Sequence, residues 1–157
     1  MLITRDLIEF KSCIAAKKQS LLCIDYGKKK SGVAISTPDK KISLPLCVIR
    51  SKKLTFQIHT IKKIIQSREV FGTVIGYPEN FSFQNCKERL TPIQKDINFI
   101  AKCIFLESNP ILIYDESFSS KDAEKSLRLV GYKKNQIKKI DDQVAASIIL
   151  EEVINGI

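Results

Sequence analysis

Histidine and paired cysteines are scarce in this sequence of 157 residues, and this limits the metal and redox chemistry open to it. The chain has one histidine, His59, and five cysteines, and no two cysteines have the C-x-x-C spacing. Zinc sites use clusters of Cys and His at short spacings, and disulfide frameworks use an even set of cysteines. We therefore expect neither, and we interpret the cysteines as reduced, small hydrophobic side chains.

Long apolar runs are absent as well. No stretch approaches the roughly 18 residues that cross a bilayer. Residues 1–10 carry Arg5, Asp6 and Glu9 where a secretory signal would be apolar. The sequence thus predicts a cytoplasmic protein with no membrane partner. Its length suits one domain with one core, and a hydrophobic content of 44% is typical of a globular protein.

Positive charge dominates, with 26 Lys and Arg against 17 Asp and Glu, a net charge of +9. Such a balance attracts polyanions, and lysine suits phosphate contact better than the reading of base edges. The alternative is a lysine-rich surface that only keeps the protein soluble. The lysines cluster at Lys28-Lys29-Lys30, Lys52-Lys53, Lys62-Lys63, Lys133-Lys134 and Lys138-Lys139.

Apolar periodicity predicts a short amphipathic helix over residues 4–18, followed by alternating strands and helices. We take residues 1–20 as an N-terminal helical extension and residues 21–157 as the main domain. Further strands are expected at 21–25, 31–36, 46–50, 73–75 and 111–114, and helices at 53–66, 91–105, 119–129 and from Asp141 onwards.

This order predicts an α/β fold with a mixed five-stranded sheet. The first three strands form an antiparallel meander, the later crossovers give parallel strands, and helices flank both faces. The sharpest local signal is Thr91-Pro92-Ile93-Gln94. It places Thr at a helix N-cap, Pro at the first helical position and Gln where a capping box needs it.

Acidic residues stand at the ends of the predicted elements. Asp25 ends the first strand of the domain, Asp115 and Glu116 end its fifth, and Asp142 opens the last helix. Carboxylates gathered at the ends of parallel strands would repel one another unless a divalent cation neutralised them, and oxygen ligands select Mg²⁺ or Mn²⁺. Two such ions can activate water for phosphodiester cleavage. Each acid also has a plain structural explanation as a turn or helix-start residue.

Four short blocks, in order over residues 25–150, resemble the motifs of the YqgF (RuvX) family. Any one block is weak, since D-x-G also opens actin-like ATPases, but four in order are specific. DYGKKKSGVA from Asp25 resembles D-x-G-x-K-R-x-G-V-A, IGYPEN from Ile75 resembles V-G-x-P-x-N, DESFSS from Asp115 resembles D-E-R-L-T-T, and DQVAASIIL from Asp142 resembles D-x-x-A-A-x-x-I-L.

The resemblance implies an RNase H-like fold and a hydrolase that matures the 5′ end of small-subunit ribosomal RNA on pre-ribosomal particles. By position, it implies that Asp25, Asp115 or Glu116, and Asp142 hold the metal and carry catalysis. The chain departs from the family at Ser117, which stands where D-E-R has its arginine. The departure removes a cation that could clamp a phosphate.

Lysines and one asparagine near these motifs are the candidates for nucleic-acid binding. Four of their lysines fall in residues 131–140, which we expect to form a mobile loop just before Asp142. The candidates are Lys28, Lys29, Lys30, Asn80, Lys133, Lys134, Lys138 and Lys139.

Three functions stay open at this point. The first is a metal-dependent nuclease on precursor ribosomal RNA, and the second is a Holliday junction resolvase on DNA, which would work as a dimer. The third is an RNA-binding ribosome-assembly factor without catalysis. Structured RNA is favoured over DNA as the substrate, and both a monomer and a homodimer are compatible with the sequence. An actin-like ATPase is excluded, because that fold needs two RNase H-like halves and 157 residues supply one.

The charge balance predicts salt-sensitive binding to both RNA and DNA. Each phosphate contact releases condensed counterions, so the affinity should fall by about 10³-fold or more between 50 and 200 mM salt if six or more contacts form. Fluorescence anisotropy of labelled oligonucleotides across a salt series measures this. A flat salt dependence would assign the lysines to solubility alone.

Overall fold

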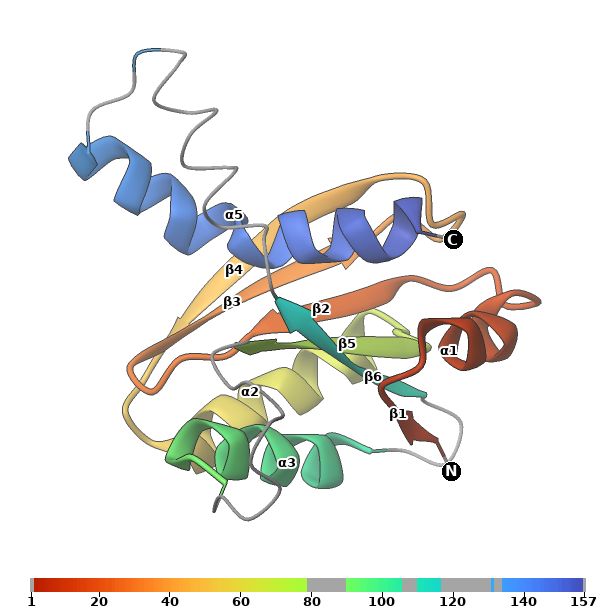
Figure 1. Cartoon of the computed structure of the whole chain (residues 1–157), viewed down its shortest axis with the longest axis horizontal. Coiled ribbons are helices and arrows are strands. Elements are labelled where there is room, and N and C mark those ends of the chain that lie inside the picture. The colour runs from red at the N-terminus through yellow and green to blue at the C-terminus, as the bar shows by residue number, and fades with distance from the viewer. Residues whose placement is uncertain (1, 79–89, 106–109, 117–130, 132–133, 157) are drawn as a thin grey trace, which may run out of the picture.

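Six strands form a mixed sheet in the computed structural model, and helices cover both of its faces (Figure 1). The structure describes residues 2–78, 90–105, 110–116, 131 and 134–156, and their side chains except those of 78, 116 and 134–143. The elements are β1 (Ile3–Thr4), α1 (Leu7–Ile14), β2 (Leu21–Asp25), β3 (Lys30–Ser36), β4 (Ser43–Arg50), α2 (Leu54–Ser67), β5 (Gly72–Pro78), α3 (Pro92–Ile104), β6 (Ile111–Glu116) and α5 (Lys134–Asn155).

The strands lie in the order β1-β6-β5-β2-β3-β4. The meander β2-β3-β4 is antiparallel, while β2, β5, β6 and β1 are parallel to one another. This confirms the predicted α/β class with its mixed sheet, but the predicted number of five strands was wrong. The sixth, β1, has two residues, Ile3 and Thr4, paired with Ile111 and Leu112. A strand so short has no periodicity of its own, and only its pairing with β6 defines it.

Local signals set the starts of the helices. The helix α1 begins later than the predicted range of 4–18, because the carboxylate of Asp6 caps it by accepting from the backbone N–H groups of Ile8 and Glu9. The predicted capping box of α3 is confirmed. The Thr91 N–H donates to Gln94 Oε1 at 2.9 Å, and the Gln94 N–H donates to Thr91 Oγ1 at 3.3 Å.

The last helix differs most from the sequence prediction. The helix α5 begins at Lys134, so the stretch expected as a loop is helical from that residue onwards, and Asp142 lies inside the helix instead of opening it. The reason is visible in the spacing of Ile137, Ile140 and Val144, which continues the helical pattern upstream of the two aspartates. The helix expected at 119–129 lies outside the described residues.

Two hydrophobic clusters form the core, one on each face of the sheet. On one face α2 and α3 pack over Leu22, Ile24 and Ile75, and on the other α1 and α5 pack over Cys23 and Val74. Side chains alternate between the faces along a strand, so successive residues of β2 belong to different clusters. Among the described residues, no helix is both long enough and apolar enough to cross a bilayer.

The buried hydroxyl of Thr73 provides a test of this packing. Thr73 is fully buried, and its Oγ1 has no hydrogen-bond partner among the described atoms. We predict that Thr73→Val raises the free energy of unfolding by about 1 kcal/mol, because a methyl group replaces an unsatisfied hydroxyl.

Thr4 is the matched control, since it is also buried but its hydroxyl donates to Glu9 Oε2 at 2.5 Å. Thr4→Val should lower the free energy of unfolding by about 1 kcal/mol. Urea denaturation of both variants measures the two changes in the free energy of unfolding. Destabilisation by Thr73→Val would contradict the conclusion that the Thr73 hydroxyl has no hydrogen-bond partner.

Candidate functional site

Asp25 stands at the end of β2 in a row of residues that crosses the sheet. It pairs with Gly32 of β3 on one side and with Gly76 of β5 on the other, and Gly76 pairs in turn with Tyr114 of β6. Because glycine has no side chain, the positions beside Asp25 on both neighbouring strands are bare. Glycine inside a strand often marks a place where a ligand approaches the backbone closely. The backbone on either side of Asp25 is therefore free of side chains in this row, although both glycines are buried.

The acids of β6 lie at the same edge of the sheet. Because β2, β5 and β6 are parallel, their carboxyl ends meet there, and Asp115 and Glu116 pair with Tyr77 and Pro78 at the end of β5. One strand separates them from Asp25, so the backbones of Asp25 and β6 are about 10 Å apart. Asp25 and Asp115 are both half-buried. This is the edge at which ligands gather in sheets with parallel strands.

The alternation of side chains separates the two acids of β6. Asp25 continues the series of Leu21 and Cys23, which belong to the cluster beneath α1 and α5. Asp115 continues the series of Ile111 and Ile113, which belong to the cluster beneath α2 and α3. The carboxylates of Asp25 and Asp115 therefore leave opposite faces of the sheet. By the same alternation, position 116 belongs to the face of the sheet that Asp25 occupies. The side chain of Glu116 itself is not among those described.

Asp142 lies in the first half of α5, the helix that covers the face of the sheet to which Asp25 belongs. Figure 1 shows that this half of the helix lies towards the edge where β2 and β5 end. Helix α5 packs on β2, β3 and β4, and the Ser43 hydroxyl donates to the Ser147 carbonyl at 2.8 Å. The structure describes no side chain for Asp142, so its convergence with Asp25 stays a prediction.

Tyr114 and Glu152 add polar groups to this face that the sequence did not single out. Tyr114 stands in the row of Asp25, beyond Gly76, and its side chain is hydrogen-bonded to Glu152 of α5. Burial raises the pKa of the Glu152 carboxyl, and the Tyr114 hydrogen bond partly offsets this by favouring the ionised form. Burial also raises the pKa of Tyr114. A tyrosine in a strand and a glutamate in a helix are ordinary residues, so no sequence signal distinguished them.

The residues predicted for nucleic-acid binding divide into two groups. Lys28 and Lys29 are exposed in the β2–β3 turn, and the half-buried Lys30 begins β3, so all three lie at the edge of Asp25. Of the remainder, Asn80 and Lys133 lie outside the described residues. The backbones of Lys134, Lys138 and Lys139 belong to α5, without described side chains.

The donor set suits a hard cation, although it is incomplete in the side chains that the structure describes. Among those side chains, no three His, Cys, Asp or Glu groups are close enough to hold a metal ion. Glu116 and Asp142, which would complete a set of oxygen donors around Asp25, are outside that comparison. Carboxylate oxygens at this edge would suit Mg²⁺ or Mn²⁺.

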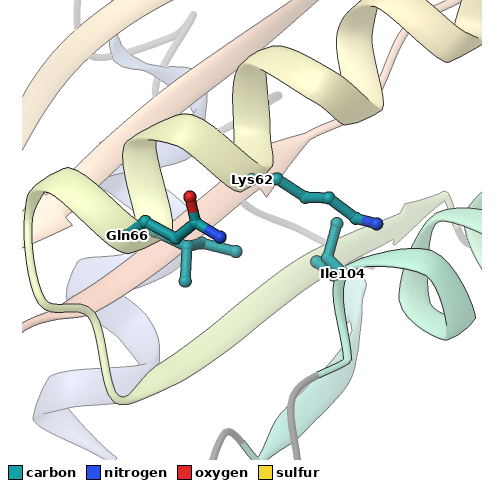
Figure 2. Close-up of a pocket in the computed structure, with 4 residues that line it drawn as sticks. Lys62, Gln66 and Ile104 are labelled. Carbon is teal, nitrogen blue, oxygen red and sulfur yellow. The ribbon is translucent and has the colours of Figure 1, made fainter.

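A small cavity elsewhere is not the site. It has a volume of about 100 Å³ and lies between α2 and α3, where it is lined by Lys62, Ile65, Gln66 and Ile104 (Figure 2). These residues fall in the last half of α2 and at the end of α3, and each of these helices leads into a parallel strand. The cavity therefore lies towards the edge where the strands begin, away from Asp25.

Comparison with solved structures defines the class of fold. The crystal structure of the fowlpox virus Holliday junction resolvase has a TM-score of 0.51 to this chain and 12% sequence identity. The match covers 88% of this chain and 100% of the resolvase chain. The protein thus has the RNase H-like fold of the resolvases.

Sequence comparison identifies the family within that class. The family described as "RuvX: Holliday junction resolvase" matches residues 19–156, and the chain belongs to this RuvX (YqgF) family. A protein of Rickettsia peacockii (strain Rustic), named "Putative pre-16S rRNA nuclease", is 34% identical over 99% of this chain and 98% of its own length. A protein of the same name from Rickettsia bellii (strain OSU 85-389) is 36% identical over 87% of this chain and 86% of its own. The resemblance inferred from the four motifs is confirmed.

Proposed function

We propose that this protein is a metal-dependent nuclease that processes the 5′ end of precursor small-subunit ribosomal RNA in the bacterial cytoplasm. The observation that carries the proposal is the position of Asp25, at the carboxyl edge of parallel strands and between Gly32 and Gly76. A carboxylate at this edge could hold a cation against a phosphodiester. The relatives named for pre-16S rRNA support RNA as the substrate.

The metal set that we propose is Asp25, Glu116 and Asp142. Glu116 is preferred to Asp115 because its position in the strand belongs to the same face of the sheet as Asp25, the face that α5 covers. A bound Mg²⁺ or Mn²⁺ would supply an activated water and stabilise the leaving oxygen. The three acids would fix the position of the cation, and Lys28 and Lys29 would hold the phosphate backbone without reading its sequence.

The decisive experiment offers the purified protein two labelled substrates, a precursor 16S rRNA fragment and a four-way DNA junction. Each is incubated with Mg²⁺, Mn²⁺ or EDTA. We expect cleavage of the RNA with either metal and none with EDTA. Preferential cleavage of the junction would instead identify a DNA resolvase, as in the family description. RNA binding without any cleavage would identify an assembly factor.

Asp25→Asn keeps the size of the side chain and removes the charge that a hard cation needs. We predict that it lowers the cleavage rate by at least about a hundredfold, because losing even an outer-shell partner of a metal ligand costs roughly 10- to 100-fold. Circular dichroism should show an unchanged fold. Wild-type activity in this variant, with contaminating nuclease excluded, would remove Asp25 from the metal set.

A matched pair of variants distinguishes the two acids of β6. Glu116→Gln should lower the cleavage rate by the same factor as Asp25→Asn. Asp115→Asn should lower it by less than about tenfold, since its carboxylate leaves the opposite face. Isothermal titration with Mn²⁺ separates metal affinity from chemistry. The reverse ranking of the two variants would place the metal on the other face.

A further inference from the structure

A second basic segment lies beside the turn of Lys28–Lys30. Lys30 pairs with Arg50 across β3 and β4, two residues beyond the row of Asp25 and Gly32. The chain then continues from β4 through Ser51 and two further lysines into α2. Every cation of the two segments is exposed except Lys30, which is half-buried, and residues 26–32 and 50–58 contain no acidic residue. The exposed cations are Lys28, Lys29, Arg50, Lys52 and Lys53.

The buried side chain of Gln57 joins these two segments. It comes from α2 and is fully buried, which is unusual for a glutamine. Its Nε2 donates to the carbonyl of Gly27 at 3.1 Å and to the carbonyl of Ser51 at 2.8 Å. Both donors of the amide are therefore used, one on each basic segment.

Further hydrogen bonds close the network around this glutamine. The Ser31 hydroxyl donates to Gln57 Oε1, and the same hydroxyl accepts from the N–H of Gly27 at 3.2 Å. The N–H of Ser51 donates to the carbonyl of Lys29 at 3.0 Å. The turn and the segment that follows β4 are thus bound to each other directly as well as through the amide.

The turn is also held on its other side and has little room to change. The Tyr26 hydroxyl donates to Asp96 of α3 at 2.7 Å. A side chain added at Gly27 would place its Cβ 2.3 Å from the carbonyl oxygen of Lys30, which is far inside any real contact. The backbone under the lysines is therefore restrained from beneath by hydrogen bonds to α2 and α3.

We propose that residues 28–30 and 50–53 form one surface that binds the phosphate backbone of the nucleic acid, and that Gln57 is the positioning residue that holds its two halves together. The proposal deepens the nuclease function, because this surface adjoins the Asp25 edge. It adds Arg50, Lys52 and Lys53 to the substrate path. Lysines on a fixed backbone lose less freedom when they bind, and this is what the buried amide contributes.

The exposed ring of Phe56 indicates the form of the nucleic acid. Phe56 is 52% exposed in the first turn of α2, and it follows Leu54 and Thr55 after the lysines of this surface. Cations beside an exposed aromatic ring are the groups that bind unpaired strands, where the phosphates contact the cations and a base stacks on the ring. The surface should prefer a single-stranded segment of RNA to a continuous duplex.

The first test compares two variants that remove the same charge. Arg50, Lys52 and Lys53 are changed to Gln in one, and Lys18, Lys62 and Lys63, which are exposed but lie away from this edge, are changed to Gln in the other. Anisotropy with a single-stranded RNA should show a loss of at least about tenfold in affinity and a salt slope smaller by about 2 for the first variant. The second should lose less than about threefold. Equal losses would overturn the proposal.

The second test is a double-mutant cycle that isolates the role of Gln57. Gln57→Leu should weaken RNA binding several-fold, and adding the Arg50/Lys52/Lys53 changes should then cost much less than in the wild-type background. Ser36→Ala is the control, because its buried hydroxyl accepts from the N–H of Leu21 at the opposite end of β2 and β3, and its effect should multiply with that of the charge changes. Multiplicative losses with Gln57→Leu would show that the amide only stabilises the fold.

Two further readouts keep the test decisive. If Gln57→Leu fails to fold by circular dichroism, Ser31→Ala takes its place, because it removes one hydroxyl from the same network. Phe56→Leu should lower the affinity for single-stranded RNA more than that for duplex RNA.

Wild-type protein that binds RNA but does not cut it would overturn the nuclease proposal and leave this surface standing. Equal losses in the two charge variants of an active enzyme would overturn the surface alone.

Discussion

The parallel register of β2, β5 and β6 is the constraint on which the rest of this structure depends. It aligns Asp25, Gly76 and Tyr114 in one row and brings the acids of β6 to the same edge. Backbone hydrogen bonds fix this alignment, and a slip of one residue would turn every side chain of a strand to the other face. The buried residues on both sides of the sheet forbid such a slip. Core packing thus determines which carboxylate can share a face with Asp25.

The two faces of the sheet have different tasks. Beneath α2 and α3, the polar groups of Gln57, Ser31 and Tyr26 hold the β2–β3 turn through hydrogen bonds. Burial, together with the hydrogen bond to Asp96, raises the pKa of Tyr26 well above its usual value. The opposite face, beneath α1 and α5, carries Asp25. A buried amide with all its donors satisfied makes a turn rigid without placing a charge in the core. One face therefore supports the edge, and the other carries the acid of the proposed metal site.

The local elements of the fold were predictable because their signals are short-range. The capping box at Thr91, the strand before Asp25 and the apolar pattern of α2 were each read from neighbouring residues, and the family followed from four motifs. The errors share a cause. Strand β1 exists only through its pairing with β6, and the Asp141-Asp142 pair resembles a helix start although the apolar spacing begins upstream at Ile137. The roles of the acids are still predictions, and only their common edge is described.

The sequence by itself determined the class of fold, the family, the excess of positive charge and the acids at the ends of the strands. Each of these depends on composition, on periodicity or on residues that are close in the chain. Only the tertiary structure decided that Asp25 stands between two glycines, that Asp115 leaves the opposite face, and that Gln57 joins the basic segments. Register and burial are relations between residues on different strands and helices, and no local pattern encodes them because the partner strand or helix supplies half of each interaction.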